Sequence, residues 1–352
     1  LLPALMAGTG PDVFFGMGQS EPVNLALRGA LTDLTDLPGC AEVLSRFSAE
    51  SYRPFRLRDG IYALPETRSY YMLFYRKDIL QDLGIPLSDL DTWDGLLRRA
   101  LPVLQTNALN VGVPAAINSY LMFLYQQGGT LYNGDLTASG LGSAEAVAAM
   151  SLYTSLYTEY GLQLAFDLAN RFRSGEMPVA VADLLTYNQL TVFAPEIRGM
   201  WGMLPVPGTV QADGTVSHLA PSTVTGVTLM SSAGDKDAAW HLMTWWTDAD
   251  TQTAFGRDIE SVVGSAARYN SANTAAFDSV GWDGDMLARL QQQREWLRAV
   301  PEAPGGYYTS RHYDFAFRAI VYQGKNVRVS LRDAAESIDK ELRKKQAEFG
   351  IE

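Results

Sequence analysis

The sequence is poor in the residues that build disulfides and metal clusters. Cys40 is the only cysteine in 352 residues, so no internal disulfide can form. The three histidines, His218, His241 and His312, are scattered, and with one cysteine they supply no ligand set for a zinc cluster. We therefore expect no metal and no other cofactor. The lone cysteine does not identify the compartment, because a lobe with a large core folds without disulfides even outside the cell.

Long apolar runs and an excess of basic charge are also absent. No apolar run reaches the roughly 18 residues that a membrane-spanning helix needs. The 28 lysines and arginines against 39 acidic residues give a formal net charge of −11. A chain this acidic repels phosphate backbones, which argues against a nucleic-acid partner. The one basic cluster, Arg343 to Lys345, suits the C-terminal end of a helix, where the dipole favours cations.

Motifs of common enzyme classes are missing as well. The chain has no G-x-S-x-G, Walker A, G-x-G-x-x-G or H-E-x-x-H sequence. Residues 89–95, DLDTWDG, begin like a calcium loop, but Trp93 stands where a ligand is needed and the closing glutamate is absent. Carboxylates are numerous, and their spacing does not tell which ones face each other. A glycosidase-like enzyme with two catalytic carboxylates therefore stays open as an alternative to a binding protein.

Composition and periodicity indicate an α/β protein with two lobes. A chain of 352 residues is longer than one ordinary core and fits two lobes of roughly 150 residues each. Short apolar segments predict strands at 13–15, 61–64, 70–75, 178–182 and 224–230, with Pro65 at the break between the second and the third. Apolar residues at helical spacing predict helices at 79–83, from Thr92, around 148–160 and from Asp237. Alternating strands and helices are typical of α/β architecture.

The C-terminal helix has the clearest pattern. Ser330 is its predicted N-cap, and Asp333 follows three residues later in a capping-box arrangement. The helix carries one apolar stripe: Leu331, Ala335, Ile338, Leu342 and Phe349. The stripe predicts that one face of this helix packs on the core.

Four stretches, taken in order, resemble a known family. They are Ala7 to Phe14 (AGTGPDVF), Asp59 to Pro65 (DGIYALP) followed by Tyr75 to Leu80 (YRKDIL), Phe172 to Glu176 (FRSGE) before a short apolar strand, and Ala238 to Trp245 (AAWHLMTW). Together they resemble the family 1 extracellular solute-binding proteins of ABC importers, the sugar-binding group that includes maltose-binding protein. The tail from Gly305 to Gly350 is similar to the subset found as lipoproteins in Gram-positive bacteria.

The resemblance implies a type II periplasmic-binding-protein fold, in which two α/β lobes hold a ligand in the cleft between them. On this chain it implies an N-lobe at 1–110, a C-lobe at 111–222, a return to the N-lobe at 223–262 and a mainly C-lobe segment with the terminal helix at 263–352. It also implies that Leu1 to Ala7 are the end of the family's first long helix. The first strand and helix of the family would then be missing, which would leave a gap in the N-lobe sheet.

Candidate ligand contacts follow predicted strands, because ligands of open α/β sheets lie beyond the carboxyl ends of strands. Together with the resemblance, this rule gives twelve candidates: Gln19, Glu66, Arg68, Tyr70, Tyr120, Asp183, Tyr187, Trp201, Thr223, Tyr307, Tyr308 and Arg311. These residue types suit a carbohydrate, since planar polar side chains bond its hydroxyls and aromatic rings pack on its C–H faces.

The resemblance further implies a monomer that captures a sugar or oligosaccharide, delivers it to the membrane permease of an ABC importer and catalyses no reaction. It implies a place outside the cytoplasm, on the surface of a Gram-positive cell or in a periplasm. Contact with the membrane would come only through a lipid anchor upstream of this chain. Two alternatives stay open: a glycosidase-like enzyme, and a binding or sensor domain of a larger surface protein.

Overall fold

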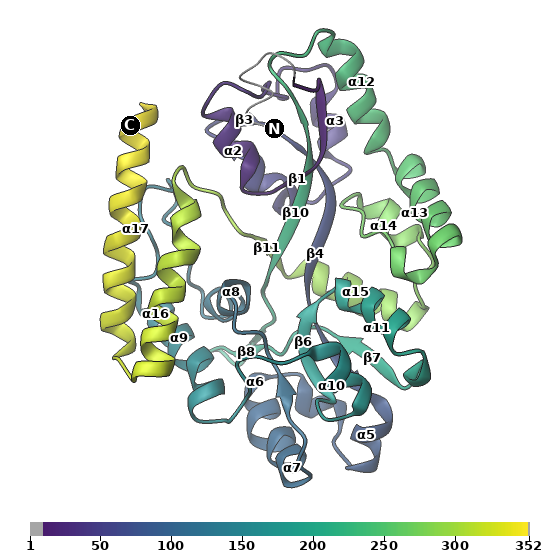
Figure 1. Ribbon diagram of the computed structural model, residues 1–352, viewed down its shortest axis with the longest axis vertical. Helices are drawn as coiled ribbons and strands as arrows, with labels where there is room; N and C mark the ends of the chain where they lie inside the picture. Colours follow the sequence, from purple (N-terminus) through teal and green to yellow (C-terminus); the bar gives the residue numbers. More distant parts are fainter. Residues whose placement is uncertain (1–9, 351–352) are drawn as a thin grey trace.

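The computed structural model describes residues 10–350, which form an upper and a lower lobe joined by three crossing strands (Figure 1). The crossing strands are β4 (Leu64–Arg76), β10 (Ala220–Leu229) and β11 (Leu297–Ala299). The upper lobe contains β1 (Val13–Gly18), α2 (Glu21–Ala26), α3 (Cys40–Leu44), α4 (Ala49–Tyr52), β2 (Arg56–Leu57), β3 (Gly60–Ile61) and α12 (Lys236–Trp246), with α13 (Ala249–Val263) and α14 (Thr274–Ser279) along its right-hand side.

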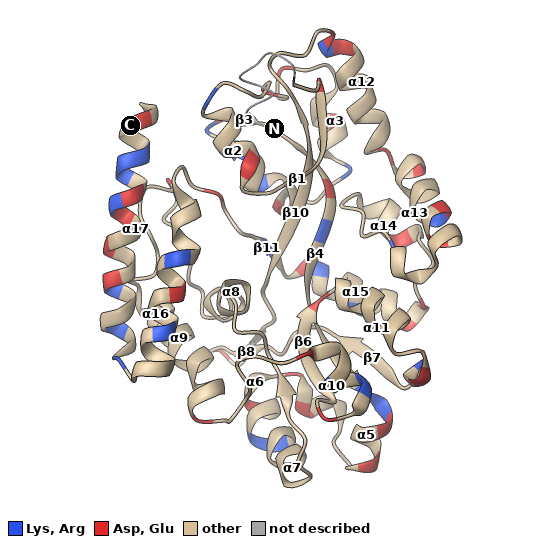
Figure 2. Cartoon of the chain, viewed as in Figure 1, with Lys and Arg blue, Asp and Glu red and all other residues tan. Residues whose placement is uncertain are grey.

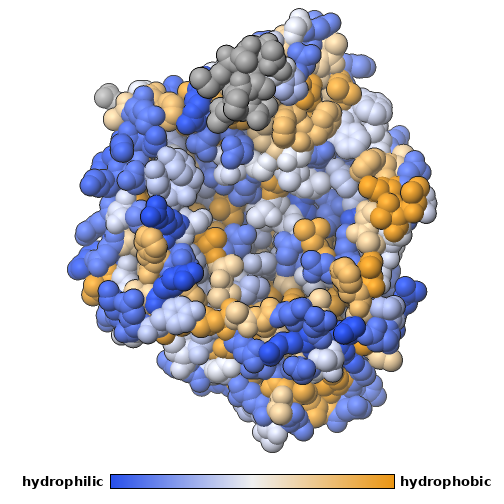
Figure 3. Space-filling view, in the orientation of Figure 1, coloured by the Kyte–Doolittle hydropathy of each residue, from blue (hydrophilic) through white to orange (hydrophobic). Residues whose placement is uncertain are grey.

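The lower lobe holds the larger core. Its elements are α5 (Lys77–Asp82), α6 (Trp93–Gly95), α7 (Leu101–Thr106), β5 (Val111–Gly112), α8 (Ile117–Gln126), α9 (Ala144–Thr158), α10 (Leu168–Ser174), β6 (Val179–Asp183), α11 (Leu185–Phe193), β7 (Trp201–Leu204), β8 (Thr209–Val210), β9 (Val216–Ser217), α15 (Gly284–Glu295), α16 (Thr309–Gln323) and α17 (Val327–Phe349). Among residues 10–350 no helix is both long enough and apolar enough to cross a bilayer. Figure 3 shows that the surface is hollowed between the two lobes, at the height where β4 and β10 cross.

One strand belongs to both lobes. β4 pairs with β10 from Leu64 to Tyr70, and from Tyr71 onward it pairs with β6 and then also with β7. The main sheet therefore runs in the order β1-β10-β4-β6-β5, with β11 added to β10 and β7 added to β4. Among the described strands β1 pairs with β10 alone, so it ends the sheet on that side. The helix end predicted at residues 1–7 lies outside the described residues.

Each lobe has its own apolar core. The upper core gathers Leu34, Leu64, Val227, Leu229 and Met243, each at most 1% exposed. The lower core is built around aromatic rings: Phe74, Phe123, Tyr153 and Phe172 are fully buried. Burial of one such side chain contributes about 1.5–3 kcal/mol to the free energy of folding. Because each lobe has its own set of buried side chains, each is stabilised by its own core.

The predicted strands at 13–15, 178–182 and 224–230 are confirmed as β1, β6 and β10. The helix predicted from Thr92 is also confirmed, and the Thr92 hydroxyl accepts the Gly95 N–H as its cap. The separation of 61–64 from 70–75 at Pro65 is wrong, because β4 runs through Pro65 without a break. Pro65 is tolerated there because it lies beside a register shift between Thr225 and Gly226 of β10, where the ladder is already irregular.

The predicted lobe boundary near residue 110 is too late. The segment 77–106 packs in the lower core, where the Trp93 and Phe123 rings lie 4.5 Å apart. The chain therefore leaves the upper lobe within β4. Val227 and Leu229 of β10 pack in the upper core with α12, and the return to the upper lobe over residues 223–262 stays a prediction.

The C-terminal helix begins one turn earlier than predicted. Asn326 is the N-cap of α17, and its side chain accepts the Val329 N–H at 3.1 Å. Ser330 lies inside the helix, and its buried hydroxyl has no hydrogen-bond partner among the described residues. The predicted apolar stripe is confirmed from Leu331 to Leu342.

We expect Asn326→Ala to lower the free energy of unfolding by about 1 kcal/mol, the usual cost of removing a helix cap. Ser330→Ala is the control, and it should change stability by less than about 0.5 kcal/mol because that hydroxyl makes no hydrogen bond. Urea unfolding followed by circular dichroism measures both. A larger loss for Ser330→Ala than for Asn326→Ala would restore Ser330 as the cap.

Candidate functional site

The paired region of β4 and β10 presents two unlike faces. One face carries four half-buried hydroxyls, here called the hydroxyl face: Thr67, Ser69, Thr223 and Thr225. Thr67 lies opposite Thr225 and Ser69 lies opposite Thr223, so the four side chains point the same way. The alternate residues point to the other face and are buried: Arg68, Tyr70, Ser222 and Val224.

The lower lobe meets the hydroxyl face at the end of β6. Asp183, the last residue of β6, accepts a hydrogen bond from the Ser69 hydroxyl at 2.5 Å and another from the Leu185 N–H at 2.9 Å. Burial raises the pKa of Asp183, and these two hydrogen bonds lower it in part. Next to this pair the Ser119 hydroxyl, in the first turn of α8, lies 3.4 Å from the Tyr71 hydroxyl. The site thus offers a carboxylate acceptor beside several hydroxyls.

The upper lobe contributes Gln19, which follows β1. Its side-chain oxygen accepts the Val224 N–H at 3.1 Å, and its amide nitrogen donates to Glu302 at 3.2 Å. Glu302 lies on the segment after β11, so Gln19 links the upper lobe to a crossing segment. Burial raises the pKa of Glu302 to about 7, the hydrogen bond from Gln19 lowers it and the nearby charge of Glu21 raises it.

Glu66 and Arg68 are engaged by neighbouring groups of the fold, except that Arg68 Nε has no hydrogen-bond partner among the described residues. The Glu66 carboxylate accepts the Gly16 N–H at 2.6 Å and the Trp246 Nε1–H at 2.8 Å, and burial raises its pKa. Arg68 donates to the hydroxyls of Ser48 and Ser222 at 2.7 and 2.9 Å. Charged side chains otherwise lie mainly on the outer helices, and β4 is unusual in carrying them between the lobes (Figure 2).

An aromatic cluster borders α11 of the lower lobe. The Tyr187 ring contacts Trp201 and Trp282 edge-on, with centroids 5.6 and 5.0 Å apart. The Arg268 guanidinium lies 4.6 Å from the Trp282 ring centroid and is paired with Glu260 at 2.6 Å. Tyr187 is half-buried, whereas Trp201 is 8% exposed and packs into the core. Of these rings, Tyr187 keeps a surface that a ligand can contact.

Six of the predicted contacts lie on the two strands or next to them: Asp183 and Thr223 on the open side, Glu66, Arg68 and Tyr70 turned inward, and Gln19 bonded to Val224 and Glu302. The Tyr70 hydroxyl has no partner among the described residues. Tyr120 lies inside the lower core, stacked on Tyr313 at 5.3 Å, so it does not reach the hydroxyl face.

The last three predicted contacts lie apart from the strands. The Tyr307 and Tyr308 rings stack at 4.3 Å just before α16, and Tyr307 is 49% exposed. Arg311 is exposed in the first turn of α16, with its guanidinium 5.4 Å from the Phe315 ring. They are candidates for the rim of the site and not for its floor.

Of the four residues of the hydroxyl face, sequence reasoning missed Ser69. No local signal marked it, because residues 66–70 read Glu-Thr-Arg-Ser-Tyr, with charged side chains at two of the positions that the fold buries. The prediction placed a break at Pro65 and so did not count this stretch as a strand.

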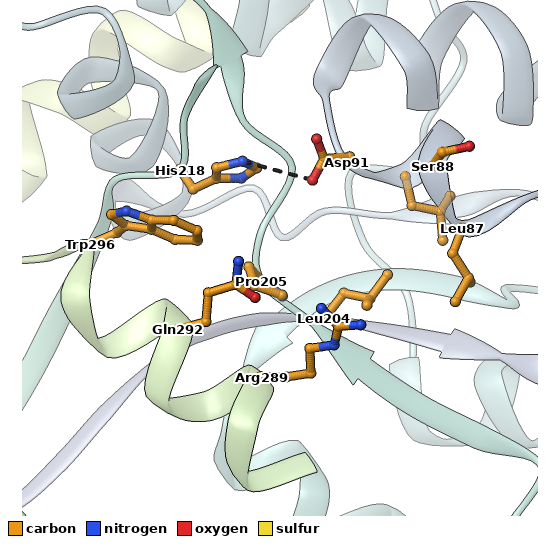
Figure 4. Close-up of a pocket in the computed structure, with 10 residues that line it drawn as sticks. Leu87, Ser88, Asp91, Leu204, Pro205, His218, Arg289, Gln292 and Trp296 are labelled. Atoms are coloured by element: carbon orange, nitrogen blue, oxygen red, sulfur yellow. Dashed lines mark ion pairs between the residues drawn. The ribbon is translucent and has the colours of Figure 1, made fainter. Parts of the chain in front are cut away.

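A separate cavity of about 250 Å³ lies in the lower lobe (Figure 4). His218 stacks on Trp296 at 4.7 Å, its Nδ1 lies 2.8 Å from the Val206 carbonyl oxygen, and its Nε2 lies 3.8 Å from Asp91. These contacts tie the loop before α6 to the residues around β10 and α15. Within residues 10–350 no three histidine, cysteine or acidic side chains gather in a way that could hold a metal ion.

Comparisons with known proteins agree with this geometry. The family model described as bacterial extracellular solute-binding protein matches residues 1–279. A candidate binding protein of Brucella abortus is 24% identical over 344 aligned positions, which cover 85% of this chain and 78% of the relative.

Solved structures share the fold. The sugar-binding protein MalE from Xanthomonas citri superposes with a TM-score of 0.83 at 18% identity, covering 100% of this chain and 88% of that one. An ABC transporter solute-binding protein from Thermotoga lettingae, bound to α-D-tagatose, gives 0.75 at 21% identity, covering 97% and 88%. The GacH receptor of Streptomyces glaucescens, solved with acarbose, gives 0.77 at 17% identity, covering 97% and 86%. The predicted two-lobe, type II binding-protein fold is therefore confirmed.

We expect the free energy of unfolding to fall as the pH rises from about 4.5 to 7, because of Glu302. In this window the folded protein keeps a proton on Glu302 that the unfolded chain has released, since the folded pKa is about 7 against an ordinary 4.5. The contribution is complete below pH 4.5 and is lost as the pH rises through 7, with a slope of about 1 kcal/mol per pH unit. Glu302→Gln should remove this slope in urea unfolding series, and Glu295→Gln, on the exposed side of α15, should keep it. A Glu302→Gln variant with the wild-type slope would contradict the assignment.

Proposed function

The chain belongs to the bacterial extracellular solute-binding proteins, and we propose that it captures a sugar or oligosaccharide between its lobes. The family binds solutes and does not transform them. The observation that carries the proposal is the hydroxyl face of β4 and β10, with Asp183 at its lower end and Gln19 at its upper end. This set offers donors and acceptors from both lobes at the place where the strands cross.

The chemistry of this set suits a carbohydrate. A sugar hydroxyl can donate to the Asp183 carboxylate or to the oxygen of Ser69, and the charge-assisted hydrogen bond to Asp183 is the stronger of the two. Tyr187 supplies an aromatic surface on which sugar C–H groups can pack. In our proposal Thr223 belongs to the floor, and Tyr307, Tyr308 and Arg311 contact a longer sugar at the rim. Proteins of the same fold have been solved with tagatose and with acarbose bound.

Capture is coupled to movement of the lobes in this proposal. Pairing along β4 changes partner between Tyr70 and Tyr71, so bending there moves one lobe relative to the other. A sugar that contacts Gln19 above and Asp183 below favours the closed arrangement, because it binds that state better than the open one. The membrane permease of an ABC importer then recognises the closed, loaded protein and receives the sugar.

The cellular setting follows from the family and from the resemblance of the tail. An extracellular solute-binding protein works outside the cytoplasm, in a periplasm or on a cell surface. We place this one at the membrane through a lipid anchor, as in the Gram-positive lipoproteins that residues 305–350 resemble, and we expect it to act as a monomer.

Asp183→Asn should weaken carbohydrate binding by about 10- to 100-fold, since a hydrogen bond to a charged acceptor contributes about 1.5–3 kcal/mol. A thermal-shift screen of mono- and oligosaccharides identifies the ligand, and isothermal titration calorimetry then compares the variant with the wild type. Asp94→Asn, which changes an exposed carboxylate on α6 of the same lobe, is the matched control.

Four outcomes decide the proposal. One sugar class that stabilises the wild type, with no product after long incubation, supports capture for import. Product formation would favour the glycosidase-like alternative. If no sugar raised the melting temperature, another class of solute would be favoured. Equal sugar affinities of Asp183→Asn and wild type would show that Asp183 is not part of the site.

A further inference from the structure

A groove of about 1070 Å³ lies at the hinge. Its lining comes from α4 and the β2–β3 turn of the upper lobe, from the end of α8 and the loop after it in the lower lobe, and from the segment after β11. We call it the hinge groove and define it by six of its residues: Glu50, Arg56, Arg58, Tyr125, Arg298 and Glu302.

The hinge groove lies on the side of the crossing strands that faces away from the hydroxyl face. The inward-pointing Arg68 donates to Ser48, directly before α4, so α4 covers that side. Glu50 of α4 accepts the Ala299 N–H at 2.7 Å. The helix α8, seen end-on in Figure 1, has Ser119 beside the hydroxyl face at its start and Tyr125 in the groove at its end. The crossing strands therefore lie between the two sites, which are linked at one point by the hydrogen bond from Gln19 to Glu302 at 3.2 Å.

The groove carries unpaired positive charge in an acidic protein. Arg56, Arg58 and Arg298 are exposed, and none of them forms an ion pair with any residue in the range 10–350. Glu50 is already engaged by Arg53 at 3.0 Å and by the Ala299 N–H. Of the other two acidic residues in the lining, Glu302 is turned to Gln19, and Asp135 is exposed on the loop after α8. Three guanidinium groups are thus available where the rest of the chain has a formal surplus of negative charge.

One of these arginines stands at a backbone position that disfavours it. Arg58 has φ of +57° in the two-residue turn between β2 and β3, where glycine, asparagine or aspartate is usual. A residue kept in this conformation at some cost in stability suggests a functional use of its side chain.

We propose that the hinge groove is a second binding site, for a small organic anion with at least two carboxylate or phosphate groups, and that its occupancy is coupled to the position of the lobes. Guanidinium groups bind both of these oxyanions in a bidentate manner. The volume is at the upper end of the range for small-molecule sites, so it can hold a ligand of several rings. A ligand held by Arg58 above and by residues beyond α8 below has to be released or rearranged when the lobes move.

The coupling between the hinge groove and the ligand cleft must be reciprocal. If the anion favours one position of the lobes, it changes the affinity of the cleft for its ligand, and that ligand changes the affinity for the anion by the same factor. The reciprocal effect between the two ligands rests on the proposed function, because it takes the cleft ligand to be a sugar. Binding of the anion alone does not rest on the proposed function.

Calorimetric titration without sugar tests the site. The probes are citrate for carboxylates and inorganic pyrophosphate for phosphates, each at low and high salt, and neither probe is a sugar. We expect one of them to bind the wild type once per chain and more weakly at high salt. Arg58→Gly and Arg56→Gln should each weaken it about tenfold, and Arg98→Gln, an exposed arginine of the lower lobe, should not. Arg58→Gly should also fold at least as stably as the wild type, because glycine accepts the positive φ.

Small-angle X-ray scattering tests the coupling without any sugar. The bound probe should change the radius of gyration of the wild type and leave that of Arg58→Gly unchanged. Failure of both probes to bind, or equal binding by Arg58→Gly and wild type, would overturn the site. Binding with no change in the radius of gyration would overturn the coupling. A failure of the sugar proposal would leave both of these measurements unaffected, so the two failures can be told apart.

Discussion

The continuity of β4 is the constraint on which the rest of the structure depends. A single strand of 13 residues is hydrogen-bonded to β10 in the upper lobe and to β6 and β7 in the lower lobe. The lobes are therefore two parts of one sheet, and they can move only by bending the strands that cross. The change of partner falls between Tyr70 and Tyr71, next to the Ser69–Asp183 hydrogen bond. The candidate site thus lies where movement of the lobes changes the geometry most.

The buried face and the hydroxyl face of the crossing strands have different roles. On the buried face Arg68 is held by two hydroxyls, and Glu66 on the same strand is held by two N–H donors, without a charge of opposite sign in contact. Removal of any one of these partners would leave a buried charge unsatisfied, so this face fixes the register of the strands. The hydroxyl face makes fewer contacts and stays half-buried, which leaves its polar groups available to a ligand. The hinge groove, on the far side, borders the same strands and is shaped by the same bend.

Much of the fold could be predicted from the sequence. The strands β1, β6 and β10, the helix that begins after Thr92 and the apolar stripe of α17 follow from local patterns, because each depends on the spacing of apolar residues or on a cap nearby in the chain. The break predicted at Pro65 and the cap predicted at Ser330 were wrong for a shared reason. In each case the local pattern was sound, but a partner distant in sequence or one turn away decided the outcome: an irregular ladder opposite Pro65, and the side chain of Asn326.

The sequence by itself determined the two-lobe α/β class and the kind of residue that a solute site would use. Only the tertiary structure decided which of those residues face a ligand. Arg68 and Ser69 are neighbours in the chain and equally polar, yet one is enclosed by Ser48 and Ser222 and the other meets Asp183. Side chains on a strand alternate between faces, so the choice depends on which face the rest of the fold covers. That cover comes from α4 on one side and is absent on the other, and no local pattern near β4 contains this information.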